Sequence, residues 1–337
     1  MLSLIQLSGS PYDVGQSLGK FGAEAAHAHL VSSHAWQSVM AWKGTLQARA
    51  MSAMVREHFP SIWNELDGLA AGLELPLEEV VLWNCRGDVW AMAPDGCTTV
   101  QVPLACGPRI THNEDGDPAF AGHCAIAEIA IDQGSHFASF VYPASIPGHT
   151  FAVTETGLVM TVNNLRWRQV AVGVPRMVLT RAVLDQGSVP AALSLLRTIP
   201  RAGGFHLSLA QRGQPDLLSV EFSTMGVSSQ PVQIPSLHAN HAIHASMRDF
   251  PQIITKSSLC RQQSGDAMLD TAQDPLAILA DQRNADFPVY RNALDDSDGE
   301  NTMATADMHV GADAVRWQVY ERPGEPARFQ LIDARIR

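Results

Sequence analysis

The spacing of apolar residues divides the chain into a helical first third and a strand-rich remainder. After a short strand-like start at 2–7, Ser10 and Pro11 provide an N-cap followed by proline in the first helical turn. Apolar residues then recur every three or four positions, which predicts helices up to about Trp90. The predicted apolar faces comprise Val14, Leu18, Phe21 and Ala25, and later Ile62, Leu66, Leu69 and Leu73.

Short segments rich in β-branched and aromatic residues follow a turn-forming cluster at 93–96. They read CTTVQVP, PRITHN, CAIAEIAI, HFASFVY, FAVTETGLVMTVNN, DLLSVEFS, TMATADMHV, AVRWQVYER and ARFQLID. Helical patterns return at 175–185, 189–197 and 275–282, and the acidic run at 295–300 is predicted to be an exposed loop. Strands and helices in separate runs predict a layered α+β fold with antiparallel strands. No internal repeat or linker divides the chain.

Composition and charge exclude several classes of protein. The 337 residues are 46% hydrophobic and 17% charged, which is typical of a globular protein with a substantial core. The net charge of −11 opposes binding to nucleic acid or to an anionic membrane. No apolar run approaches the roughly 18 residues of a membrane span, and the start of the chain lacks a secretory signal. With five cysteines and no CxxC pair, we expect reduced thiols and a cytoplasmic protein.

Cys97 is the candidate nucleophile, because it follows Gly96 in a turn and begins a predicted strand. A thiol after glycine can reach back to its own upstream carbonyl, which is the geometry of an N-to-S acyl shift. Hydrolysis of that thioester would leave Cys97 as a new N-terminus, whose α-amino group can act as base toward the adjacent thiol. The ordinary alternative is an inert buried cysteine at a strand end.

Five segments in a fixed order favour the nucleophile. They are DGCTTV at 95–100, THNEDGD at 111–117, SLHANHA at 236–242, KSSLCRQQ at 256–263 and DFPVYR at 286–291. Together they resemble the self-cleavage site and later motifs of the acyl-coenzyme A:6-aminopenicillanic acid acyltransferase family. This family, also called peptidase family C45, belongs to the N-terminal-nucleophile hydrolases.

The resemblance implies an αββα four-layer sandwich, with two packed antiparallel sheets between helical layers. It also implies self-cleavage between Gly96 and Cys97, giving an α chain of 1–96 and a β chain of 97–337 that remain together as one folded domain. The expected reaction is hydrolysis, or acyl transfer, at a linear amide of a small molecule such as an N-acyl or β-alanyl conjugate. No cofactor and no metal is expected, and a homo-oligomer is compatible with the sequence.

The resemblance also assigns roles to individual residues. Cys97 attacks the substrate carbonyl, and the side-chain amide of Asn240 donates to the developing oxyanion. Asp115 orients the liberated α-amino group, and Arg291 pairs with Asp115 or holds a substrate carboxylate. Thr99 shares a strand face with Cys97 and donates a hydrogen bond during cleavage. Without the resemblance, Asp115 would be interpreted as a turn residue, Asn240 as a backbone cap and Arg291 as a surface charge.

Two positions depart from the family pattern, and both are expected to line or support the substrate pocket. Glu114 stands where the family has an aromatic residue, and Tyr290 stands where a small residue or cysteine precedes the arginine. His238 and His241 have a spacing of three, which places them on opposite faces of a strand and does not favour a metal site.

Three alternatives stay open at this point. The first is an unprocessed member of the same fold that binds ligands with the Gly96–Cys97 bond intact. The second is a conventional Cys–His peptidase, for which His112 is the candidate histidine. The third is an acyl-coenzyme A-dependent acyltransferase, which would need a basic patch from residues such as Arg166, Arg168 or Arg176.

Overall fold

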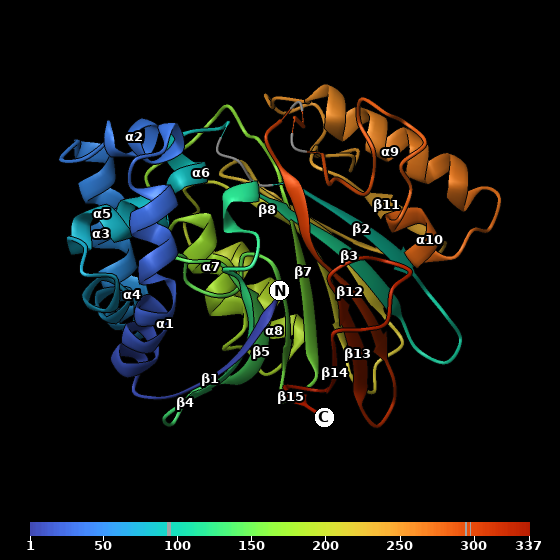
Figure 1. Cartoon of the computed structure of the whole chain (residues 1–337), viewed down its shortest axis with the longest axis horizontal. Helices are drawn as coiled ribbons and strands as arrows, with labels where there is room; N and C mark the ends of the chain where they lie inside the picture. Colours follow the sequence, from blue (N-terminus) through green and yellow to red (C-terminus); the bar gives the residue numbers. More distant parts are fainter. Residues whose placement is uncertain (93–95, 294, 297) are drawn as a thin grey trace.

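Two β-sheets packed face to face form the centre of the molecule, and helices cover both outer faces (Figure 1). The computed structural model describes residues 1–92, 96–293, 295–296 and 298–337. Its layers follow the order helices, eight-stranded sheet, seven-stranded sheet, helices. The predicted α+β sandwich is thereby confirmed.

The first helical layer comes from the first third of the chain, as its apolar spacing predicts. Its predicted apolar positions are buried, except that Phe21 is half-buried. Helices α1 and α4 pack closely because Gly15 has no side chain. A Cβ atom at Gly15 would lie 2.0 Å from the carbonyl oxygen of Glu65. The elements are α1 (Pro11–Ala25), the π-helical turn η1 (Ala26–Leu30), α2 (His34–Met40), α3 (Leu46–His58), α4 (Pro60–Leu73), α5 (Leu77–Trp83) and α6 (Arg86–Val89).

The eight-stranded sheet packs against this layer and against α7 (Arg176–Val183) and α8 (Val189–Thr198). Its strand order is β1-β4-β5-β6-β7-β8-β9-β10. One ladder departs from the predicted antiparallel pattern: β1 runs parallel to β4, and the chain between them forms the first helical layer and then β2 and β3 of the other sheet. The strands are β1 (Ser3–Gly9), β4 (Ala125–Ile131), β5 (His136–Val141), β6 (Phe151–Thr154), β7 (Leu158–Asn164), β8 (Phe205–Gln211), β9 (Leu217–Phe222) and β10 (Val227–Pro231).

The seven-stranded sheet contains the candidate nucleophile and has the order β11-β2-β3-β12-β13-β14-β15. Helices α9 (Lys256–Leu269) and α10 (Pro275–Leu279) cover its outer face (Figure 1). The strands are β2 (Gly96–Val102), β3 (Arg109–Gly116), β11 (Ser236–His238), β12 (Asn301–Val310), β13 (Val315–Tyr320), β14 (Phe329–Ile332) and β15 (Arg335–Ile336), and a 3-10 turn, η2 (Pro118–Phe120), follows β3.

Of the predicted turn at 93–96, residues 93–95 lie outside the described part of the chain. The prediction of an exposed loop at 295–300, of which residue 297 also lies outside the described part of the chain, holds for Asp295 but was wrong at two positions. Glu300 is buried, and the Asp296 side chain is only 4% exposed, because both carboxylates bind the guanidinium of Arg291. Among the described helices, none is long and apolar enough to cross a membrane.

Candidate active site

Cys97 is the second residue of β2, and the structure buries it at the end of the strand where the chain enters the sheet. Strand β2 lies between β11 and β3, but the β11 ladder reaches only Thr99, so a strand pairs with Cys97 on the β3 side alone. Cys97 pairs directly with Glu114 on β3. The candidate nucleophile therefore has little freedom to move.

The side chain of Asn240 and the guanidinium of Arg261 hold the peptide groups of Cys97. The N–H of Cys97 donates to Oδ1 of Asn240 over 3.1 Å, and its carbonyl oxygen accepts from Nη1 of Arg261 over 2.7 Å. Nη2 of Arg261 also donates to Oδ1 of Asn240 over 2.6 Å. Nδ2 of Asn240 donates to the carbonyl oxygen of Asn164 over 3.2 Å, which fixes the orientation of the amide.

Gly96 has no room for a side chain. A Cβ atom at this position would lie 2.2 Å from Oε2 of Glu300 and 3.2 Å from Nη1 of Arg291. Arg291 donates to Oε2 of Glu300 over 2.6 Å, and Arg166 donates to Oε1 over 3.4 Å. The buried carboxylate of Glu300, bound by Arg291 and Arg166, thus packs directly against Gly96.

Asp115 pairs in register with Gly96 and is buried. Burial raises the pKa of Asp115, while the charges of Arg291 and Arg261 oppose that shift. Its Oδ1 accepts a hydrogen bond from Thr302 over 2.7 Å, whereas no described residue donates to its Oδ2. Arg291 reaches Asp115 indirectly: its backbone N–H donates to the Thr302 hydroxyl, and its guanidinium binds Asp296 and Glu300.

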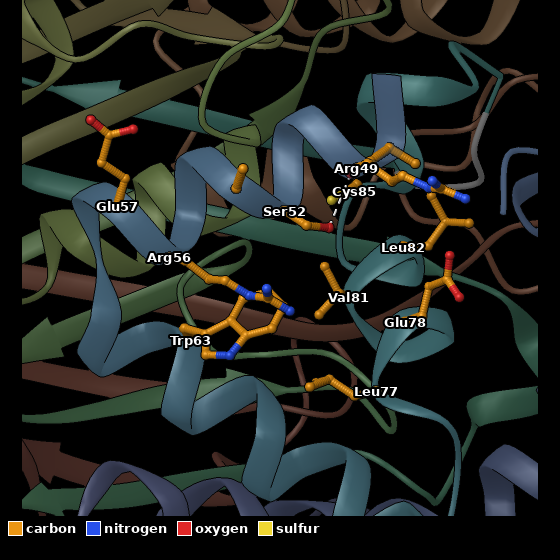
Figure 2. A pocket seen from close by; sticks show the side chains of 12 residues that line it. Arg49, Ser52, Arg56, Glu57, Trp63, Leu77, Glu78, Val81, Leu82 and Cys85 are labelled. Atoms are coloured by element: carbon orange, nitrogen blue, oxygen red, sulfur yellow. Dashed lines mark hydrogen bonds between the residues drawn. The ribbon is translucent and has the colours of Figure 1, made fainter. Parts of the chain in front are cut away.

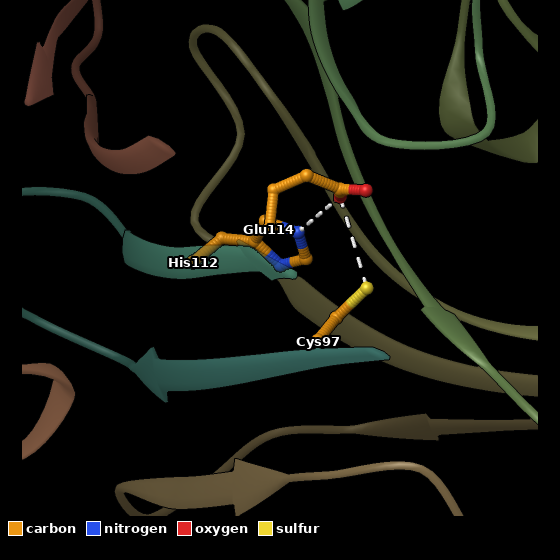
Figure 3. A group of neighbouring side chains, drawn as sticks. All are labelled: Cys97, His112 and Glu114. Carbon is orange, nitrogen blue, oxygen red and sulfur yellow. Dashed lines mark hydrogen bonds and ion pairs between the residues drawn. The ribbon is translucent and has the colours of Figure 1, made fainter. Parts of the chain in front are cut away.

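Thr99 and Cys97 extend from the same face of β2, toward the space between the sheets. The Thr99 hydroxyl lies 2.7 Å from Oδ1 of Asn163 and 2.7 Å from Nδ1 of His112. Its single proton is therefore directed at β7, away from the Gly96–Cys97 bond. Glu114 lies beside this group, with Oε2 at 3.1 Å from Nε2 of His112 and 3.7 Å from Sγ of Cys97 (Figure 3).

Sequence reasoning missed several residues of this site. Arg261 belongs to a quoted motif, KSSLCRQQ, but received no role, and Glu300 was placed in an exposed loop. Glu114 was expected at a pocket wall, whereas the structure places its carboxyl group against the candidate nucleophile. The signal for Arg261 was present in the motif, but a contact between α9 and β2 depends on the tertiary fold.

His238 and His241, the two histidines considered for a metal site, each contact a different side chain of the protein. Nε2 of His238 lies 3.0 Å from Oε1 of Glu221, and Nδ1 of His241 lies 2.8 Å from the Ser258 hydroxyl. Burial, followed by the charge of His238, lowers the pKa of His241 to about 4. These two histidines bind the protein itself and do not converge on one point.

Cavities occur both near the site and away from it. A cavity of about 750 Å³ lies in the first helical layer between α3, α4 and α5, and none of its lining residues belongs to β2 or β3 (Figure 2). There the Arg56 guanidinium lies 4.1 Å from the centre of the Trp63 ring. A much smaller pocket borders Gly116, next to Asp115, and includes Trp83, Arg86 and Tyr142 in its walls.

The fold and this arrangement define an enzyme with a buried cysteine at a strand end of an αββα sandwich. Residues 106–321, more than half of the chain, match the family model described as acyl-coenzyme A:6-aminopenicillanic acid acyl-transferase, and the chain belongs to this family. The chain is also similar to a β-alanyl-dopamine/carcinine hydrolase of Drosophila melanogaster, with 23% identity over 320 residues, 86% of this chain and 79% of the relative. The predictions of the family and of a hydrolase related to acyltransferases are confirmed.

Proposed function

We propose that the chain is a self-processing cysteine amidohydrolase that opens linear amides of small N-acyl or β-alanyl-type substrates through a thioester at Cys97. The observation that carries the proposal is the grip on Cys97: Asn240 binds its N–H and Arg261 binds its carbonyl oxygen. The β11 ladder ends at Thr99, so these two polar side chains, and not a neighbouring strand, hold the peptide groups of Cys97 on that side.

Self-cleavage would divide the chain into 1–96 and 97–337, which stay together as one folded domain. The two proposed chains share the eight-stranded sheet, since β1 pairs with β4 over seven residue pairs from Ser3↔Ala125 to Gly9↔Ile131. The first helical layer also packs on that sheet. Apolar surface buried between the two proposed chains stabilises their association by about 25 cal/mol per Å².

In the processed enzyme, the free α-amino group of Cys97 takes the thiol proton, and Sγ attacks the amide carbonyl carbon of the substrate. The carbon–nitrogen bond then breaks, and the amine leaves with that proton. Water attacks the thioester, which gives the carboxylic acid and restores the thiol. Where an amine replaces water, the same thioester leads to acyl transfer.

Two side chains fit these steps by their hydrogen-bonding capacity. Oδ2 of Asp115 accepts no hydrogen bond from the described residues and is available to an ammonium N–H at the residue after Gly96. Nδ2 of Asn240 has a second proton beyond the one donated to Asn164, and we assign it to the oxyanion. Arg291 holds Glu300 over Gly96 and supports Asp115 through Thr302.

Acyl-coenzyme A is the less favoured acyl source. Arg166 and Arg176 are 5% and 3% exposed, and their guanidinium groups bind Glu300 and the Asn164 side chain respectively. They are engaged inside the fold, so they do not form a basic surface patch for a nucleotide. Arg168 alone is exposed among the three candidates. A neutral or cationic amide also suits the net charge of −11.

Intact mass spectrometry of the purified protein beside Cys97→Ala tests the proposal. We expect two chains that break between Gly96 and Cys97 in the wild type and one intact chain in the variant. The wild type is then assayed with β-alanyl amides, N-acyl amines and acyl-coenzyme A, following release of the amine or thiol. Two chains with amide turnover support the proposal. An unbroken wild-type chain that binds amides without turnover would show an unprocessed binding protein.

A further inference from the structure

The first self-cleavage step lacks the base that serves the processed enzyme. In the intact chain the nitrogen of Cys97 is an amide, and its N–H donates to Oδ1 of Asn240. An amide nitrogen has no basic lone pair, so it cannot take the thiol proton. If the chain processes itself as proposed above, another group must do so.

A carboxyl group lies next to the thiol on the neighbouring strand. Cys97 on β2 pairs with Glu114 on β3, and Sγ lies 3.7 Å from Oε2 of Glu114. The same Oε2 lies 3.1 Å from Nε2 of His112, and the ligand atoms of the three side chains are within 4.8 Å of one another (Figure 3). All three are buried, which strengthens their electrostatic coupling.

The hydrogen-bond network fixes the number of protons in this group. Nδ2 of Asn163 donates to the carbonyl oxygen of His238 over 3.0 Å, so its Oδ1 faces the Thr99 hydroxyl. Thr99 has one proton, which it donates to Oδ1, and it must therefore accept from Nδ1–H of His112. Nε2 of His112 and Oε2 of Glu114 then share a single proton, because two lone pairs would repel each other at 3.1 Å.

We propose that the Glu114–His112 pair is the base that takes the Cys97 thiol proton during self-cleavage. The thiol proton passes to Oε2 of Glu114, and the shared proton moves onto Nε2 of His112, which leaves a thiolate beside a carboxylic acid and an imidazolium. Sγ attacks the carbonyl carbon of Gly96, and the bond to the Cys97 nitrogen breaks. The pair returns one proton to that nitrogen, and water hydrolyses the thioester to a Gly96 carboxylate and the free thiol.

The surroundings keep the pair in its accepting form. Burial lowers the pKa of His112 to about 3, so the shared proton rests on Glu114 and Nε2 remains an acceptor. The same burial disfavours the imidazolium, so the proposed step depends on the thiolate of Cys97, formed at the same time, to offset its charge. The Phe151 ring packs edge-on against His112 with 5.7 Å between ring centres. Two further titratable groups face the pair: Cys124, whose pKa is raised by burial and by Glu114, and His206, whose pKa is lowered by burial.

Glu114→Gln tests proton transfer while keeping the size of the side chain nearly unchanged. Glutamine keeps a donor for Nε2 of His112 and an acceptor for the thiol, but it cannot accept a proton. A positioned base contributes roughly 10² to 10⁴ to a rate, so we expect self-cleavage to slow at least about 100-fold. Glu114→Asp keeps a carboxyl group and should recover part of the rate. Glu24→Gln is the matched control: it makes the same chemical change at an exposed position on α1, and the variant should cleave like the wild type.

Cleavage is followed by mass spectrometry in freshly purified precursor between pH 5 and 9, with thermal unfolding as the check on folding. Should Glu114→Gln fail to fold, His112→Gln provides the same comparison, because it removes the final proton acceptor. The inference predicts slow cleavage in whichever of the two variants folds. Cleavage within threefold of the wild-type rate and with an unchanged pH profile would overturn it. A wild type that never cleaves would instead overturn the proposed function.

Discussion

Arg261 on α9 donates a hydrogen bond over 2.7 Å to the carbonyl oxygen of Cys97 on β2. A second nitrogen of the same guanidinium donates over 2.6 Å to Oδ1 of Asn240, which accepts the Cys97 N–H. One planar group therefore connects both peptide groups of the candidate nucleophile. Because Arg261 is buried, these charge-assisted bonds are stronger than their equivalents at the surface.

Replacing Arg261 by lysine keeps the charge but removes the fork. A lysine ammonium is a point charge that cannot span the Cys97 carbonyl and Asn240 together. We expect both self-cleavage and amide turnover to fall by about tenfold or more, as rate measurements on the folded variant will show. Arg316→Lys, in an exposed pair with Asp313, should keep the wild-type rates. Equal rates in Arg261→Lys would remove Arg261 from the site.

Gly96→Ala tests the close approach of Glu300. The added methyl group would lie 2.2 Å from Oε2 of Glu300, so either the Glu300 carboxylate must leave its arginine partners or strand β2 must shift at its first residue. We expect self-cleavage to stop and the melting temperature to fall by several degrees, since overpacking costs about 1–3 kcal/mol. Gly187→Ala is the matched control, because its Cβ would meet nothing within 4 Å. An alanine variant that cleaves normally would contradict the described packing.

Thr302→Val removes the hydroxyl group that joins Arg291 to Asp115. The variant leaves Oδ1 of Asp115 without its donor at 2.7 Å, and an unsatisfied buried carboxyl group costs about 1–3 kcal/mol. We expect lower stability in urea and a lower kcat. Thr161→Val makes the same change on β7, where the buried hydroxyl has no hydrogen-bond partner among the described residues, and should be neutral. Equal effects of the two variants would argue against the Thr302 link.

Because Asp88 on α6 is buried, its titration makes the free energy of unfolding depend on pH. Burial raises the pKa of Asp88 from 3.8 to about 7, although Arg176 opposes the shift. The folded state therefore holds a proton that the unfolded state has released, and its stabilising contribution is lost as pH rises from about 4 to 7. Asp88→Asn should flatten the free energy of unfolding over that range relative to the wild type. Parallel pH profiles in urea unfolding would show that Asp88 is not the group responsible.

Much of the fold could be predicted from the sequence, because most of its helices and strands bury regularly spaced apolar residues. The segment 62–73 buries every predicted apolar position of α4. Helix α9 was not predicted, because its inward face is polar: Ser257, Ser258, Arg261 and Gln262 are all buried. Periodicity of apolar residues cannot detect a helix whose role is to bind the backbone of β2.

The site was accessible only in part. Cys97, Asp115 and Asn240 followed from short motifs, and the structure brings the three into neighbouring positions on or beside β2. The sequence indicated a pocket wall for Glu114 and an exposed loop for Glu300, and it gave neither residue its contacts, since an isolated glutamate is most often a solvated surface residue. Glu114 is buried by the pairing of β3 with β2, and Glu300 by its contacts with Arg291 and with Arg166, which is far away in the sequence.

The parallel pairing of β1 with β4 gives the proposed processing a thermodynamic consequence. Before the cut, the strand that ends at Gly9 and the strand that begins at Ala125 belong to one molecule, so refolding is a first-order event. After a cut at Gly96 the same sheet needs two molecules to meet, and refolding becomes second-order and dependent on protein concentration. A processed enzyme that unfolds in dilute solution would thus lose its partner segment, and its lifetime would be set by its unfolding rate.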